Sequence, residues 1–110
     1  MRGKRRGGKG RRGSARQILS EKIVDTDGGI TELVIWEVPD STHSPEGIKY
    51  RCAYIPPGEE QPAVLYDVHR GKSHHRHVEG VERSYKFKNV SELVNDFVTD
   101  VERIKAQKGR

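Results

Sequence analysis

The chain has 110 residues, which is enough for one hydrophobic core, and 34 % of them are charged while 32 % are hydrophobic. A single cysteine cannot form an internal disulfide, and the sequence contains neither a signal-peptide apolar segment nor a run of about 18 apolar residues. These features argue against a disulfide-rich secreted domain and against a membrane protein, so we expect a cytosolic protein.

The first 16 residues form a separate basic segment. They hold eight Lys or Arg and no acid, whereas the rest of the chain holds 13 basic and 16 acidic side chains. Because this segment has no apolar periodicity, we predict a disordered arm at 1–16 and a single domain at 17–110. Arg/Gly-rich arms bind RNA and DNA without sequence preference, although a solubility tail or a start codon placed too far upstream would look the same. The expected nucleic-acid-binding cations are Arg2, Lys4, Arg5, Arg6, Lys9, Arg11 and Arg12, together with Arg70.

Strand-like segments begin after the arm. Short stretches rich in β-branched and aromatic residues, separated by turn sequences, predict strands at 18–24, 30–38, 48–55, 63–69 and 81–88. Gly28 and Gly29 permit the positive φ of a tight hairpin between the first two. The apolar run 33–36 in the second indicates an inner strand covered by a helix on one side. Cys52 alternates with Tyr50 and Tyr54 in a strand-like pattern. We therefore interpret Cys52 as a small buried side chain rather than a nucleophile.

The last predicted element is a C-terminal helix. Its apolar stripe recurs at helical spacing and comprises Leu93, Val94, Phe97, Val98, Val101 and Ile104. Asn89 can cap its start, and Gly109 stands where it would end. The expected fold is therefore α+β: an approximately five-stranded, mostly antiparallel meander sheet with one C-terminal helix packed on a face.

The segment 66–77 holds four of the five histidines and could carry chemistry. Metal-free cleavage of RNA needs a base, an acid and fixed positive charge near the phosphate. Histidine suits both proton roles because its free pKa of about 6.5 lies near working pH. An extended chain would set His75 and His77 on one side, while Gly71 breaks the preceding strand and lets Lys72 approach. Tyr66 could be a further donor or a half-buried sheet residue.

Two other interpretations of this segment stay open. Imidazoles and one carboxylate could bind a transition metal ion, although three cations within eight residues would repel it. The segment could also be a solvated basic hairpin without chemistry. The potential metal ligands are Asp67, His69, His74, His75 and His77.

The body of the chain resembles the TumE-like family, toxins of toxin-antitoxin pairs. The motifs that carry the resemblance are 35–39, 47–54, Tyr66-Asp67, Gly71-Lys72, 75–77, Gly80, Asp96-Phe97 and Asp100-Val101. It implies a toxin role and a cognate antitoxin protein with a DNA-binding domain. His69 and His74 stand at positions that vary in the family. The expected catalytic set is therefore Asp67, Lys72, His75, Arg76 and His77.

These observations lead to the hypothesis of a toxin that is a metal-independent endoribonuclease and uses no cofactor. In it, His75 and His77 transfer protons, Lys72 and Arg76 stabilise the pentavalent phosphate, and Asp67 orients an imidazole or holds the loop. RNA or DNA and an antitoxin are the expected partners. The alternatives are a nucleic-acid-binding module without catalysis and a metal-dependent hydrolase.

Overall fold

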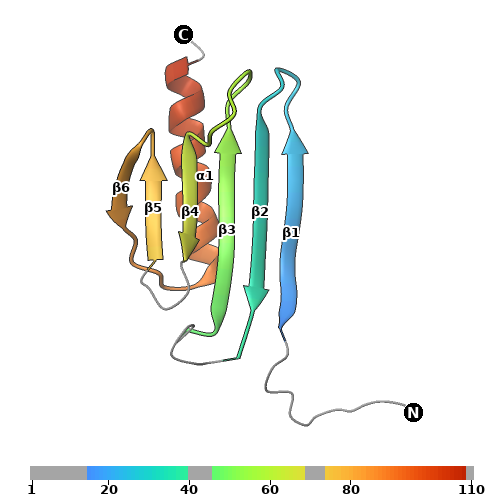
Figure 1. The fold of residues 1–110 in the computed structure, drawn as a ribbon, viewed down its shortest axis with the longest axis vertical. Helices are drawn as coiled ribbons and strands as arrows, with labels where there is room; N and C mark the ends of the chain where they lie inside the picture. The colour runs from blue at the N-terminus through green and yellow to red at the C-terminus, as the bar shows by residue number, and fades with distance from the viewer. Residues whose placement is uncertain (1–14, 40–45, 69–73, 109–110) are drawn as a thin grey trace, which may run out of the picture.

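The computed structural model describes residues 15–39, 46–68 and 74–108. Within them, six strands form one sheet in the order β1-β2-β3-β4-β5-β6, each pairing antiparallel with the next, and one helix packs on a face (Figure 1). The elements are β1 (Arg16–Val24), β2 (Ile30–Glu37), β3 (Ile48–Ile55), β4 (Val64–Val68), β5 (His74–Val78), β6 (Val81–Ser84) and α1 (Val90–Lys108). The predicted α+β meander with a C-terminal helix is confirmed.

The strand count differs from the sequence prediction by one. β5 lies in the stretch between the fourth and fifth predicted strands, where polar residues hid the alternation of a half-buried strand. It turns into β6 through Glu79 and Gly80, whose φ angles of 49° and 83° are typical of a type I′ hairpin. The strand predicted at 81–88 is correspondingly short and ends at Ser84.

The core lies between the sheet and α1. On the sheet side it contains Ile35, Cys52 and Tyr66, each with no exposed surface, and on the helix side Leu93 and Phe97 are likewise fully buried. This arrangement confirms that Cys52 is a buried side chain and that the helix has an apolar stripe. Val98 departs from the stripe, because 43 % of its surface is exposed.

Both ends of α1 are fixed by polar contacts. The Asn89 side-chain oxygen accepts a 2.8 Å hydrogen bond from the Glu92 amide, as the capping pattern predicts. Near the other end, Lys105 Nζ lies 3.0 Å from Asp25 Oδ2 in the turn that joins β1 to β2, and this contact raises the pKa of the lysine. Within the described residues, no helix is long and apolar enough to cross a membrane.

The sheet has two different faces. Figure 1 shows that α1 lies behind β4, and that β1 and β2 lie to one side of the helix. In β2, Leu33 and Ile35 are buried on the helix side, whereas Val34 and Trp36 are half-buried on the other face, as expected for an inner strand. In the described part of the chain, no helix covers that second face, which we call the open face.

Candidate functional site

β5 divides the predicted catalytic residues between the two faces. Because side chains alternate along a strand, His75 and His77 lie on the open face, and His74 and Arg76 on the helix side. The two histidines therefore share a side, as expected for an extended chain, but Arg76 does not accompany them. Lys72 lies outside the described residues, as do His69, Arg70 and the cations predicted for the arm.

Strand pairing brings further polar side chains to the two histidines. Residues directly opposite each other in neighbouring antiparallel strands share a face and lie close enough to interact. One row across β3 to β6 consists of Arg51, Asp67, His75 and Ser84, and the next consists of Ala53, Leu65, His77 and Glu82. We use the name open-face site for Arg51, Asp67, His75, His77 and Glu82.

Within the open-face site, the closest polar contact involves His75. Its Nδ1 lies 2.8 Å from Glu82 Oε2, and 23 % of the imidazole side chain is exposed. When the neutral ring carries its proton on Nδ1, this carboxylate lies beside that proton. The lone pair of the neutral ring then lies on Nε2, so His75 can act as a base through that atom. His77, two residues along, is about 7 Å away by the rise of a strand.

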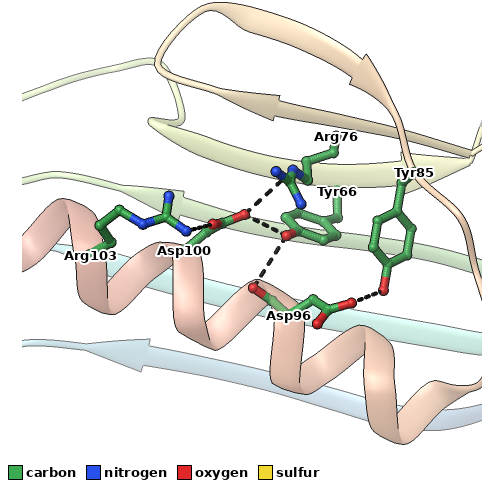
Figure 2. Close-up of polar contacts among 6 residues, drawn as sticks. All are labelled: Tyr66, Arg76, Tyr85, Asp96, Asp100 and Arg103. Carbon is green, nitrogen blue, oxygen red and sulfur yellow. Dashed lines mark hydrogen bonds and ion pairs between the residues drawn. The ribbon is translucent and has the colours of Figure 1, made fainter.

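Arg76 belongs to a polar network around a buried carboxylate on the helix side (Figure 2). The Asp100 side chain is only 3 % exposed, and its carboxylate accepts a 2.6 Å hydrogen bond from Arg103 and lies 3.6 Å from Arg76 Nε. The Tyr66 hydroxyl donates a 2.5 Å hydrogen bond to the same carboxylate. Burial and this hydrogen bond raise the pKa of Tyr66. Tyr66 is fully buried, more than its sequence position indicated.

Tyr85 contacts the helix in a similar way to Tyr66. Its hydroxyl donates a 2.6 Å hydrogen bond to Asp96 Oδ2, and its ring meets that of Tyr66 edge to face at 5.0 Å. Burial and the hydrogen bond to the carboxylate raise the pKa of Tyr85. Two tyrosines of the sheet side thus bind two aspartates of α1, which fixes the helix on the sheet.

His74 is a core residue on the helix side. Its ring stacks on Phe87 at 5.0 Å, and Nδ1 is 2.8 Å from the Tyr50 hydroxyl. On the other side Nε2 lies 3.1 Å from Glu46 Oε1. Burial raises the pKa of Tyr50, so the phenol keeps its proton in this contact with His74. His74 of β5 therefore contacts Tyr50 of β3 on the helix side. It lies on the face opposite to that of His75 and His77.

The sequence interpretation missed several residues of both groups. Strand pairing places Glu82 in contact with His75 and places Arg51 in the same cross-strand row, and no local pattern in the sequence specifies that register. Asp100 did leave a signal, because it falls at a helical spacing from Phe97 and Ile104, inside the apolar stripe. A charged residue at a stripe position indicates a buried carboxylate with partners.

The described ranges, with their gaps, contain no group of three or more His, Cys, Asp or Glu side chains placed to hold a metal ion. Burial raises the pKa of Cys52 to about 12, which keeps its thiol protonated. The ionisable side chains of the open-face site are two imidazoles, two carboxylates and one guanidinium group.

The fold and its two polar groups define a small α+β domain with one helix-covered face and one open face of mixed charge. A protein-family model described as Toxin TumE matches residues 9–105, so the chain belongs to the TumE toxin family. It is the toxin component of a toxin-antitoxin system, and a cognate antitoxin is its partner. The chain has no significant match among curated proteins and none among solved structures.

Proposed function

We propose that this toxin is a metal-independent endoribonuclease in which His75 and His77 of the open face transfer protons. The observation that carries the proposal is the placement of two imidazoles on one face of β5, with a carboxylate 2.8 Å from Nδ1 of the first. Separate acid and base groups on the two sides of one phosphate are what RNA cleavage without metal requires. A strand spacing of about 7 Å suits that arrangement.

In this proposal, neutral His75 carries its proton on Nδ1, beside Glu82. Its Nε2 removes the proton from a ribose 2′-hydroxyl, and the 2′-oxygen attacks phosphorus. His77, in its protonated form, gives a proton to the departing 5′-oxygen. The products are a 2′,3′-cyclic phosphate and a 5′-hydroxyl, and the pair then exchanges protons with water. Glu82 is a positioning residue, because it acts by holding the ring of His75.

Arg51 replaces Arg76 as the fixed cation of this proposal. It stands in the same cross-strand row as His75, with Asp67 between them, so all three side chains share the open face. A guanidinium there can bind the non-bridging oxygens of the phosphate, whose charge increases in the transition state. We retain Lys72 as a second cation and Asp67 as the group that orients Arg51 or His75. The basic arm supplies general attraction to RNA.

The experiment is cleavage of end-labelled RNA in EDTA by the full chain. We expect products with 5′-hydroxyl and 2′,3′-cyclic phosphate ends, and their loss in His75→Ala and in His77→Ala. Lys22→Gln, an exposed change on β1, should cleave as the wild type does. Unchanged cleavage by both histidine variants would refute the proposal. Binding without products would favour a non-catalytic nucleic-acid-binding module, and cleavage only with added divalent ions would favour a metal-dependent hydrolase.

A further inference from the structure

A second polar feature lies on the helix side, away from the open-face site. A hollow of about 320 Å³ is lined by Arg76 and Val78 of β5, Val81 and Arg83 of β6, and Arg103 of α1. We call it the arginine hollow. Its lining holds three guanidinium groups, two small apolar side chains and no carboxylate.

The arginine hollow carries more positive charge than its surroundings balance. Arg76 and Arg83 are directly opposite each other in the β5–β6 ladder, and like charges in such a pair repel each other. The carboxylate in contact with this group is that of Asp100, which touches Arg76 and Arg103. Among residues 15–39, 46–68 and 74–108, no ion pair joins Arg83 to an acid. About two positive charges are thus left for a ligand.

The surrounding contacts hold two of the guanidinium groups in place before any ligand arrives. Figure 2 shows Asp100 between Arg76 and Arg103, and the Tyr66 hydroxyl binds the same carboxylate. Arg76 also lies over the Tyr66 ring, 5.8 Å from its centroid. Fixing these side chains in advance lowers the entropy lost when an anion binds.

We propose that the arginine hollow binds a phosphomonoester dianion, the terminal phosphate of a nucleotide or of an RNA end. Guanidinium groups bind phosphate oxygens in a bidentate geometry, and two net positive charges match the dianion better than an internal phosphodiester with one charge. The volume lies at the lower end of small-ligand sites, which is enough for a phosphate and an attached sugar. Val78 and Val81 provide the apolar wall against which that sugar would pack.

The arginine hollow and the open-face site lie on opposite faces of β5, so the inference does not rest on nuclease activity. A His77→Ala protein that no longer cleaves RNA should still bind the phosphate. Conversely, a protein that binds no phosphate could still cleave RNA.

The test is calorimetric titration of the full chain, in about 0.15 M salt, with inorganic phosphate, adenosine 5′-monophosphate and adenosine. We expect one phosphate per chain, no binding of adenosine, and at least tenfold weaker binding in Arg83→Gln. Tighter binding of the monophosphate than of inorganic phosphate would support a phosphomonoester as the ligand. Equal affinities would show that the attached sugar is not recognised and would overturn the choice of a phosphomonoester.

The matched control is Lys22→Gln, which removes one positive charge from an exposed position of β1 at the opposite edge of the sheet. Its affinity for phosphate should stay within twofold of the wild type. Equal weakening in both variants would mean diffuse attraction by a basic chain and would overturn the proposal, as would absence of phosphate binding in the wild type. Arg83 is exposed, so its variant should keep the wild-type melting temperature, and Arg83→Lys should recover part of the affinity.

Discussion

The hydroxyl of Tyr66 donates a 2.5 Å hydrogen bond to the carboxylate of Asp100, which joins β4 to α1 through the core. Asp100 is 2 % exposed, so its charge has left water almost completely. Removing a carboxylate from water costs several kcal/mol unless charged and hydrogen-bonding partners compensate. Tyr66, Arg76 and Arg103 are those partners, and together they fix where the helix sits on the sheet.

The first prediction concerns this network. Asp100→Ala leaves two guanidinium groups without their carboxylate, and we expect the free energy of unfolding to fall by about 3–5 kcal/mol. Tyr66→Phe removes one hydrogen bond to a buried charge and should cost about 1–3 kcal/mol. Urea denaturation measures both. Glu102→Ala, an exposed change on the same helix, is the control and should shift stability by less than about 0.5 kcal/mol. An Asp100→Ala effect no larger than the control would contradict this account.

Local patterns in the sequence were enough for most of the fold. The first four strands and the helix have apolar alternation or an apolar stripe, and turn residues mark their limits. β5 was missed because the residues that it turns toward the helix side include the buried His74 and the half-buried Arg76. These two have stacking and ionic partners on β3, β4 and α1 instead of apolar neighbours. A polar residue can be buried when the tertiary structure provides such partners. The sequence of one strand does not reveal those partners, because they lie on other elements.

The candidate site was predictable in its location and only partly in its members. Period-two alternation placed His75 and His77 together, and it also separates Arg76 from them once β5 is known to be a strand. Arg51 and Glu82 come from strands that precede and follow β5, so their position depends on the register of pairing. Register is set by the whole sheet, which is why residue spacing alone could not select them.

A second prediction concerns the thiol of Cys52. The side chain is fully buried, and burial raises its pKa to about 12. At pH 8 the native protein should react with an aromatic disulfide reagent far more slowly than the same protein in urea, because the thiolate is the reactive form. Equal labelling rates in the two states would refute the burial of this thiol.

The same shift gives a pH dependence of stability. An unfolded cysteine loses its proton near the ordinary value of 9.0, whereas the native thiol keeps it up to about pH 12. Between these values the unfolded state binds fewer protons, so the free energy of unfolding decreases as pH rises through this window. The contribution is fully present below about pH 9. Cys52→Ala lacks it and should show a shallower decrease in urea denaturation between pH 9 and 11.

A third prediction tests the start of α1. Asn89→Ala removes the acceptor for the Glu92 amide, and loss of such a cap costs about 1 kcal/mol. Asn89→Asp keeps a capping oxygen and should retain most of the stability. Thermal denaturation of the two variants beside the wild type measures the difference. Equal melting temperatures for all three proteins would show that the cap contributes nothing.

The last prediction distinguishes the roles of Arg51 and Arg76, which lie on opposite faces of the sheet. Arg51→Gln removes the cation proposed to bind the phosphate on the open face, so RNA cleavage should fall about 10²- to 10³-fold in kcat. Its stability should stay close to wild type because Arg51 is exposed. Arg76→Gln should show the reverse, with lower stability because the buried Asp100 loses one of its two cations, and with cleavage that survives in the folded fraction. Lys49→Gln, on the same face of β3 and two residues from Arg51, is the matched control for charge and should lower cleavage less than threefold. If Arg76→Gln abolished cleavage at full stability while Arg51→Gln cleaved normally, the active site would lie on the helix side.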